Sequence, residues 1–467
     1  MLCVKHTGSG RGCLDRRRLL ALSATTATLA ASVKNSLAAL GADAATLGVR
    51  PDSPDDQSRV LQRAIDQAAG ARIPLVLPPG VYRAGDLRLP TGTRLIGIRG
   101  ATRLVLAGDK SLVSADNADD VSLCDLVLDG GARPLPEGRG LVHLTAGRGI
   151  RIETCDILGS GRHGIVCEQI EGEILRNTIS GAADAALHSF DARGLAITGN
   201  TVRGAGNNGI LVWRSQSGDD GTFVVDNRIE EIFARAGGSG QNGNAINVFR
   251  AGNVIVRGNR VRAAAFSAVR GNAASNLQVI GNSCTGVGEV ALYAEFAFEG
   301  AVIANNTVDG AAIGVSVTNS NESGRLAVVQ GNLIRNLTPK RPAGADPEDA
   351  AGIGVGVEAD TAVTGNVIEN APTAGIFVGW GRNLRDVAVT GNTVRRAGIG
   401  VAVSVVPGAG AAVITGNMIA ETVQGAVVGM EWKRAVTGDL TRGDTRRFDH
   451  LTIEALTRND LRTPAWP

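Results

Sequence analysis

The chain has no strong charge of either sign. Its 47 basic and 45 acidic residues leave a net charge of +2 on 467 residues. Such a balance argues against nucleic acid as a partner, and it gives no general reason for a strongly anionic polymer to bind. The sequence also lacks a P-loop, a Rossmann fingerprint and a serine nucleophile elbow. Nucleotide binding and serine-based hydrolysis are therefore not indicated.

Long apolar runs and metal-binding cysteine patterns are missing as well. The apolar stretch 19–31 is shorter than the ~20 residues of a membrane-spanning helix, and no other run approaches that length. We therefore expect no membrane span in the mature protein. The 6 cysteines include no CxxC pair and no Cys/His metal spacing, so no metal site of that kind is expected.

Glycine, in contrast, is abundant, with 63 residues, and it is periodic around a recurring asparagine. Seven of ten such asparagines follow a glycine, and their spacings run from 23 to 34 residues. Val or Ile stands three residues before each asparagine and again two residues after it, except at Cys284. The ten asparagines are Asn177, Asn200, Asn227, Asn259, Asn282, Asn306, Asn332, Asn366, Asn392 and Asn417.

A strand–turn–strand unit that recurs at this length is typical of a solenoid. Two aliphatic residues five apart cannot share one face of a regular strand, so the chain must turn a corner between them, at Gly-Asn. Stacked coils would place the asparagines one above the next, where their amides can hydrogen-bond. Cys155 and Cys124 extend the same frame upstream. The sequence predicts an all-β, parallel solenoid of about twelve coils.

This frame makes Cys124 and Cys155 neighbours in successive coils. An oxidising compartment would permit a disulfide between them. Stacked positions rarely bring Cβ atoms to the ~3.8 Å of a disulfide, so buried thiols are the alternative.

The N-terminal segment fits a cap for such a solenoid. Residues 60–68 have the pattern of a short amphipathic helix, and 75–82 and 95–97 have that of the first strands. Together with the repeat, this resembles the right-handed parallel β-helix of the pectate-lyase-like superfamily, which has a short N-terminal helical cap. More narrowly, the chain is similar to a bacterial family of twin-arginine-translocated repetitive proteins. The resemblance implies a right-handed β-helix and brings no established activity.

The first 45 residues resemble an export signal. Arg16-Arg17-Arg18 precedes the apolar stretch 19–31, as in a twin-arginine signal. We therefore expect a periplasmic or secreted protein. Four regions are predicted: 1–45, the export signal and leader; 46–100, the N-terminal cap and first coils; 101–430, the parallel β-helix; and 431–467, a C-terminal closing segment.

A second strand in each coil presents two outward columns of side chains. From His188 to Glu295 these columns carry aromatic, charged and amide groups, whereas later coils carry mostly small ones. The insertions 214–222 and 233–243 lie beside the same coils and could wall a groove. A third insertion, 336–350, lies further along the chain.

Aromatic faces beside amide and charged groups suit a sugar ring. We therefore predict a polysaccharide or other glycan as the partner, in a groove on coils 188–295. The predicted substrate-binding residues are Phe190, Asp191, Trp213, Arg214, Asn247, Phe249, Arg250 and Tyr293.

If the protein is an enzyme, the catalytic candidates are His188, Arg270 and Glu295. His188 could transfer a proton near neutral pH. Polysaccharide lyases of the resembled fold use a Lys or Arg base beside calcium ligands, which implies this role for Arg270 and makes calcium a candidate cofactor. Because an arginine pKa exceeds 12, clamping a carboxylate is the alternative role. Glu295 could be one of the two carboxylates that a glycosidase requires.

Several alternatives stay open from the sequence. The aromatic side chains could pack beneath the loops instead of binding a ligand. The protein could be a polysaccharide lyase or related hydrolase or epimerase, or a non-enzymatic cell-envelope binding or scaffold protein. Oligomer formation through one face of the rod is compatible with either function.

Overall fold

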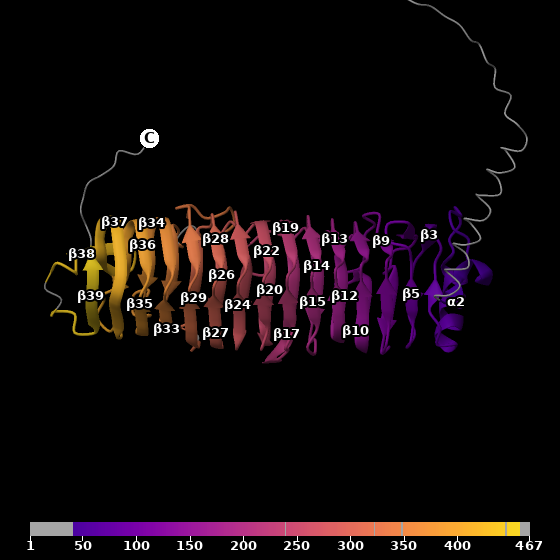
Figure 1. Cartoon of the computed structure of the whole chain (residues 1–467), viewed down its shortest axis with the longest axis horizontal. Helices are drawn as coiled ribbons and strands as arrows, with labels where there is room; N and C mark the ends of the chain where they lie inside the picture. The colour runs from indigo at the N-terminus through magenta and orange to yellow at the C-terminus, as the bar shows by residue number, and fades with distance from the viewer. Residues whose placement is uncertain (1–40, 239, 322, 347–348, 444–445, 458–467) are drawn as a thin grey trace, which may run out of the picture.

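The computed structural model describes residues 41–238, 240–321, 323–346, 349–443 and 446–457. These residues form an elongated rod of about 14 turns, with a short helix at its N-terminal end (Figure 1). Coil stacks on coil through parallel strand pairing in three columns, which we name sheets 1, 2 and 3. The prediction of an all-β parallel solenoid with a helical cap is confirmed, with about 14 turns where the sequence predicted about twelve coils. The export signal predicted at 1–45 lies almost wholly outside the described residues.

Sheet 2 precedes the asparagine of each coil, and sheet 3 follows it. The strands of sheet 2 alone are β1 (Ala42–Asp43), β2 (Leu75–Val76), β5 (Arg94–Ile96), β8 (Ser122–Cys124), β15 (Ala196–Thr198), β18 (Phe223–Val225), β21 (Ile255–Arg257), β24 (Leu277–Ile280), β27 (Glu299–Ala304), β30 (Arg325–Gln330), β33 (Ala359–Thr364), β35 (Arg385–Thr390) and β39 (Leu451–Thr457). The strands of sheet 3 alone are β3 (Gly80–Ala84), β6 (Thr102–Leu106), β9 (Val127–Asp129), β11 (Asp156–Leu158), β13 (Thr178–Ser180), β16 (Thr201–Arg203), β19 (Arg228–Ile232), β22 (Arg260–Ala264), β25 (Ser283–Thr285), β28 (Thr307–Asp309) and β31 (Leu333–Arg335).

Sheet 1 contains the second strand that the sequence singled out. Its own strands are β4 (Leu87–Arg88), β7 (Val113–Asp116), β14 (Ala185–Phe190), β17 (Asn208–Asp219), β20 (Asn244–Gly252), β23 (Val269–Asn272), β26 (Val290–Glu295), β29 (Ile313–Thr318), β32 (Ile353–Val357) and the antiparallel β38 (Arg434–Asp439). Five long strands bend from one sheet into another: β10 (Gly140–Glu153), β12 (His163–Leu175), β34 (Val367–Val378), β36 (Thr393–Ser404) and β37 (Ala412–Glu431).

Both ends of the rod are closed by elements of the chain itself. Helix α2 (Ser58–Gly70) buries Leu61, Ala64 and Ile65 against the first coils, after the short 3-10 helix η1 (Ala44–Leu47). The predicted helix therefore exists and is two residues longer at each end. At the other end β39 adds a parallel strand to β37, and Phe448 packs against the core.

The asparagines form one continuous buried ladder. Oδ1 of Asn259 accepts hydrogen bonds from the backbone N and Nδ2 of Asn227, both at 3.0 Å. Nδ2 of Asn259 donates to the Val224 carbonyl at 2.8 Å and to Oδ1 of Asn282 at 3.0 Å. The same pattern links Asn177 to Asn417, and no asparagine of the ladder is more than 1% exposed. Each coil is thus pinned to its neighbour at the same point, which fixes the register of all three sheets.

The corner itself lies one residue before each asparagine. Gly199 has a φ of 68°, and Arg176 and Asp226 take the same left-handed conformation in coils that lack glycine there, with φ of 53° and 56°. Glycine adopts this conformation at the lowest cost, which explains why it precedes seven of the ten asparagines.

The upstream extension of this frame was half wrong. Cys155 does occupy the asparagine position, because its backbone N donates to Oδ1 of Asn177 at 2.9 Å. Cys124 instead pairs with Glu153, and Leu126 fills the asparagine position of that coil. This coil has no asparagine, and two pairs of aliphatic residues have the required spacing of five. The pair Val121 and Leu126 suggested Cys124, whereas the structure uses Leu123 and Leu128, two residues further on. Cys124 and Cys155 are both free thiols, as are Cys167 and Cys284.

The ladder is testable by a single substitution. Asn332→Ala removes the acceptor for two donors of Asn306 and the donor to the Ile303 carbonyl. Because these groups are buried, we expect unfolding in urea to lose roughly 2–5 kcal/mol of free energy. Gln330→Ala is the control, since Gln330 is exposed two residues away, and it should change stability by less than about 0.5 kcal/mol. Equal effects of the two variants would contradict the role of the ladder.

Candidate functional site

Sheet 1 presents the two outward columns in the predicted register. In the first column His188 pairs with Leu211, Leu211 with Asn247, Asn247 with Arg270, and Arg270 with Tyr293. In the second column the pairs run from Phe190 through Trp213, Phe249 and Asn272 to Glu295. The structure therefore brings the predicted residues onto one face. Within that face they divide into two separate clusters.

The first cluster is aromatic. The His188 ring lies 5.2 Å from the rings of His163 and Trp213 and 5.9 Å from that of Phe190, edge-on in each case. Trp213 in turn lies 5.9 Å from Phe249. The edge-to-face arrangement is the favourable one for aromatic pairs, so these rings stabilise each other.

The environment of His188 keeps its imidazole neutral. Burial, with a smaller contribution from His163, lowers the pKa of His188 from 6.5 to about 4. Its Nε2 is buried and has no hydrogen-bond partner in the described structure. A general acid or base works best with a pKa near the operating pH. His188 is thus tuned away from the proton-transfer role that the sequence suggested.

The polar neighbours of this cluster hold the loops. Asn247 accepts a hydrogen bond from Nε1 of Trp213 at 3.1 Å and donates to the Gly240 carbonyl at 3.1 Å, inside the insertion 233–243. On the opposite edge of sheet 1 Asp191 accepts from the backbone N of Ser215 at 2.9 Å.

Two arginines complete the attachment of the insertion 214–222, most of which continues strand β17. Nη1 of Arg214 donates to the Ala192 carbonyl at 3.2 Å and lies 3.7 Å from the buried Asp220. Nη1 of Arg250 donates to the Ser215 carbonyl at 3.1 Å, and its guanidinium lies 4.6 Å from the centre of the Phe249 ring. Three of the predicted binding residues, Asp191, Asn247 and Arg250, therefore hold the backbone of the two insertions, and Arg214 attaches its own insertion to the Ala192 carbonyl.

The second cluster is a buried network of charges. Arg270 makes a two-pronged contact with Glu295, with Nε–Oε1 at 2.7 Å and Nη2–Oε2 at 2.8 Å, and its Nη1 lies 3.4 Å from Oε2 of Glu289. Asn272 donates to Oε1 of Glu295 at 2.8 Å. From the insertion 336–350, Arg341 reaches Oε1 of Glu289 at 3.0 Å. The network ties that insertion to sheet 1.

These contacts decide between the two predicted roles of Arg270. Burial by itself lowers the pKa of Arg270, but the contacts with Glu295 and Glu289 outweigh it and raise the pKa above its ordinary value. Arg270 is therefore disfavoured as a base. It does clamp a carboxylate, as the alternative predicted, but that carboxylate belongs to Glu295 of the same chain. Glu295 is 0% exposed, so its carboxylate is a partner of Arg270 and does not face a ligand.

Next to this network lies an open cleft on later coils. Its volume is about 460 Å³, and Tyr293 is the only predicted site residue in its lining. We call it the cleft. It is lined by Tyr293, Ile313, Ser316, Val317, Thr318, Arg341, Asp349, Ala350, Ile353, Gly356, Val357, Glu358, Phe377, Gly379, Trp380 and Lys433.

The cleft exists because the outward column carries a glycine between larger residues. A Cβ atom placed on Gly356 would have no other atom within 4 Å. Phe377 follows in the next coil, with Trp380 at a ring distance of 5.9 Å. Arg341 stands at one wall, held by Glu289 and, at 3.3 Å, by Asp349. Hydroxyl, carboxylate, cationic and aromatic groups thus surround one space.

One carboxyl in the cleft has a perturbed acidity. Burial raises the pKa of Glu358, and hydrogen bonds from the backbone N of Ser320 and Asn319 oppose that effect. Both bonds end on Oε2, at 3.0 and 2.9 Å.

Sequence reasoning missed this cleft, although two signals pointed to it. The later coils carry mostly small residues, and two of them, Ser316 and Gly356, stand between the large Tyr293 and Phe377 and so leave a hollow. The insertion 336–350 contributes one wall through Arg341 and Asp349. Trp380 and Lys433 come from turns that the columns do not include.

None of the helices in the described part of the chain combines the length and apolarity needed to cross a membrane. Within the same residues no three or more His, Cys, Asp or Glu side chains are grouped so as to hold a metal ion. The carboxylates beside the predicted site are engaged elsewhere: Asp219 accepts from Asn253 at 2.8 Å, and Asp191 from Ser215.

Stacked parallel coils with an internal asparagine ladder define a parallel β-helix protein. The chain belongs to the family described as "Right handed beta helix region", which matches residues 136–229 and 214–394, more than half of the sequence. No curated protein sequence matches the chain.

Solved structures with the same fold are distant in sequence. The N-terminal fragment of bacteriophage Phi29 gene product 12 is 14% identical with a TM-score of 0.55, over 89% of this chain and 76% of that one. The pre-mature form of the same phage protein is 12% identical with a TM-score of 0.50, over 90% and 60% of the two chains. The catalytic unit of a GH87 α-1,3-glucanase from Streptomyces thermodiastaticus is 15% identical with a TM-score of 0.46, over 84% and 68%. At such identities the likeness shows the fold alone.

The low pKa of His188 predicts a loss of stability in acid. The unfolded chain protonates this histidine near pH 6.5, whereas the folded protein keeps it neutral down to about pH 4. The stabilisation is therefore complete above pH 6.5 and is lost as the pH falls towards 4, by up to roughly 3 kcal/mol. In His188→Phe, urea unfolding at a series of pH values should show a correspondingly smaller loss. Identical pH profiles for the two proteins would contradict this interpretation.

The charge network predicts a strong coupling between Arg270 and Glu295. Arg270→Met leaves two buried carboxylates without their main cation and should cost about 3–5 kcal/mol of unfolding free energy. The double variant Arg270→Met with Glu295→Met should recover at least half of that loss, because the fully buried charge is removed too. Arg385→Met, at an exposed pair with Asp360, should cost less than about 1 kcal/mol. Additive effects of the two core substitutions would argue against the pairing.

Proposed function

We propose that this protein is exported and binds a polysaccharide along sheet 1, with the cleft as its principal contact. The observation that carries the proposal is the cleft itself, an open space of about 460 Å³ bordered by Tyr293, Phe377 and Trp380 together with polar and charged groups. Tyr293 joins it to the coils 188–295 on which the sequence predicted a glycan site.

The lining suits a carbohydrate for two reasons. Sugar rings present flat C–H patches that pack on aromatic surface, and the partly exposed Tyr293 and Trp380 offer such surface beside the buried Phe377. Sugar hydroxyls both donate and accept hydrogen bonds, and Ser316 and Thr318 on the cleft floor do the same. Binding sites for small molecules generally combine apolar walls with a few polar groups in this way.

The charges of the cleft narrow the class of glycan. Arg341 and Lys433 are balanced by Asp349 and Glu358. A cleft that carries both positive and negative side chains gives no preference for a uniformly anionic polysaccharide, and the net charge of +2 on the whole protein gives none either. A neutral polysaccharide, or one with isolated charged groups, is the partner that this balance favours.

A second hollow supports a polymer over a single sugar. It lies on sheet 1 nearer the N-terminus, has a volume of about 1030 Å³ and includes Asp116, His143 and Glu168 in its lining. From His143 to Gly356 the outward column takes eight steps, or ~38 Å at a strand spacing of ~4.8 Å. The aromatic cluster around Trp213 lies between the two, so one extended chain could follow the whole face.

The export part of the proposal rests on the sequence. Arg16-Arg17-Arg18 and the apolar stretch 19–31 support twin-arginine translocation to the periplasm or beyond. The narrower resemblance to twin-arginine-translocated repetitive proteins supports the same route. Polysaccharides of the cell envelope would be available to the protein there.

Cleavage of the bound glycan is the second candidate function. The raised pKa of Glu358, caused chiefly by burial, is the property of a carboxyl group that donates a proton to a leaving oxygen. Asp349, a second carboxylate in the cleft, is half exposed at one wall. Binding without cleavage needs neither property and remains the leading proposal.

Binding is tested with two variants of the cleft, and urea unfolding checks that each is folded, because Trp380 also packs against a buried apolar cluster. Gly356→Leu should partly fill the cleft, since a Cβ atom at this position has no other atom within 4 Å and the side chain can extend into the open space. Trp380→Ala should remove one aromatic face. We expect each to weaken binding to a polysaccharide panel at least about tenfold, or ~1.4 kcal/mol, in microarray and calorimetric titrations. Leu333→Ala, at an apolar residue 42% exposed on sheet 3, is the control.

Product analysis after incubation of the protein with the same polysaccharide panel distinguishes cleavage from binding alone. Release of reducing ends or unsaturated uronides that Glu358→Gln abolishes, with binding retained, would support cleavage. Binding without products would leave the protein as a glycan-binding protein. Unchanged binding in both cleft variants, or no binding to any glycan of the panel, would reject the proposal.

A further inference from the structure

The three outer faces of the rod differ in chemistry. On sheet 3 oppositely charged side chains alternate from coil to coil: Arg203 and Arg262 contact Glu230 at 2.7 and 3.1 Å, and Arg335 contacts Asp309 at 2.9 Å. Such a ladder of ion pairs is a solvated surface. On sheet 2 one outward column has no ionisable residue over nine coils. It consists of Ala196, Phe223, Ile255, Gln278, Val302, Val328, Ala362, Ala388 and Val413.

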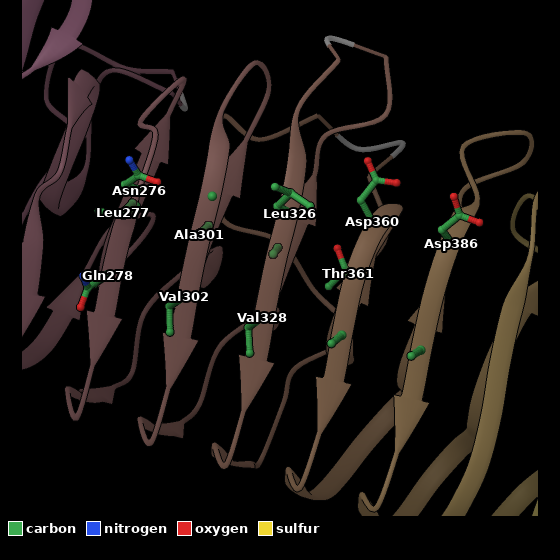
Figure 2. A pocket seen from close by; sticks show the side chains of 14 residues that line it. Asn276, Leu277, Gln278, Ala301, Val302, Leu326, Val328, Asp360, Thr361 and Asp386 are labelled. Atoms are coloured by element: carbon green, nitrogen blue, oxygen red, sulfur yellow. The ribbon is translucent and has the colours of Figure 1, made fainter.

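Part of this column forms a shallow groove, which we call the sheet 2 groove. Figure 2 shows it across strands β24, β27, β30, β33 and β35, with Val302 and Val328 projecting from the sheet and Asp360 and Asp386 at its rim. Its volume is about 590 Å³. Leu326 stands on the same rim, 50% exposed. Exposed apolar patches of this kind mark contact sites more often than plain surface.

The same column also carries a projection of matching character. Phe223 is 46% exposed, and it lies five coils before Ala362, whose small side chain belongs to the groove. Five steps at the strand spacing amount to ~24 Å. Phe223 is a projection and Ala362 lies in a hollow of the same straight column. When a second copy lies antiparallel on this face, the Phe223 side chain of each copy can enter the hollow at Ala362 of the other.

We propose that sheet 2 is the interface of a twofold-symmetric dimer in which two rods lie antiparallel, face to face. The symmetry axis passes between Gln278 and Val302, midway between the projection and the hollow. Phe223 of each copy then lies opposite Ala362 of the other. This is an isologous contact, the commonest kind in homodimers.

Charges at the ends of the overlap agree with this register, and Asp360, which falls opposite the turn of Asp219 and Asp220, is already paired with Arg385 of its own chain. The axis that pairs Phe223 with Ala362 also places Asp386 opposite the turn that contains Arg193. Neither side chain has an ion-pair partner in the described part of its own chain, and Arg193 is exposed. Two symmetric Arg–Asp pairs would therefore flank the apolar stripe.

The area of the contact between the two copies indicates how strongly the dimer should associate. The overlapping coils span ~34 Å along the rod and about five residues, or ~16 Å, across it. That is about 540 Å² per copy, below the roughly 800 Å² of a standard interface, and typical of a weak association. We expect a dimer with a dissociation constant in about the micromolar range. Sheet 1 faces another direction, so the contact does not depend on the proposed glycan binding.

Sedimentation velocity of the full mature chain over a concentration series tests this dimer. The wild type should shift from monomer to dimer as concentration rises. Phe223→Asp and Ala362→Asp should each stay monomeric at concentrations where the wild type is dimeric. Val367→Asp, at an apolar side chain 44% exposed on sheet 3, is the matched control and should dimerise like the wild type. Unfolding curves check that every variant is folded.

A charge exchange tests the orientation. Arg193→Asp and Asp386→Arg should each weaken the dimer about threefold or more, and the double variant should restore it. A monomer at all concentrations, a trimer, or equal disruption by Val367→Asp would overturn the proposal. Failure of the double variant to restore the dimer would overturn the antiparallel register.

Discussion

The buried asparagine ladder is the constraint on which the rest of the structure depends. Each rung satisfies a backbone N–H and a backbone carbonyl of a neighbouring coil, groups that would otherwise be buried without partners at the corner. Because every coil is fixed to the next at this one point, side chains far apart in sequence stand in straight outward columns. The aromatic cluster, the charge network and the apolar stripe are all consequences of that alignment.

The outer face of sheet 1 contains a buried charge network and an open cleft, and the first determines the shape of the second. A network of ion pairs joins Arg270 to Glu295 and Glu289, and Glu289 to Arg341. Because Arg341 belongs to the insertion 336–350, the network fixes that insertion over the sheet. The same insertion then forms a wall of the cleft. A buried ion network is weak support for stability when compared with apolar packing. Its value here is positional, since it determines where a loop stands relative to Tyr293 and Gly356.

The fold followed from the sequence because its signal is local and repeated. The spacing of asparagine, glycine and aliphatic residues fixed the parity of each strand, and the outward columns were correct from Val166 to Ala402. The frame slipped only at Cys124, where no asparagine anchored it. The cleft was not predictable in the same way. Arg341, Trp380 and Lys433 reach it from turns of unequal length, and the space above Gly356 depends on what surrounds a missing side chain.

The hydrogen-bonded rungs join residues separated by 23 positions in one coil and by 34 in another, with the same geometry. Loop length is therefore uncoupled from coil spacing. An insertion or deletion at a turn changes the outer surface of one coil and leaves the alignment of every other coil intact. Whole coils are interchangeable units in the same sense, because each ends on the same donor and acceptor with which it began. A rod built in this way can be lengthened, shortened or given new walls by duplication and loss of segments, one coil at a time.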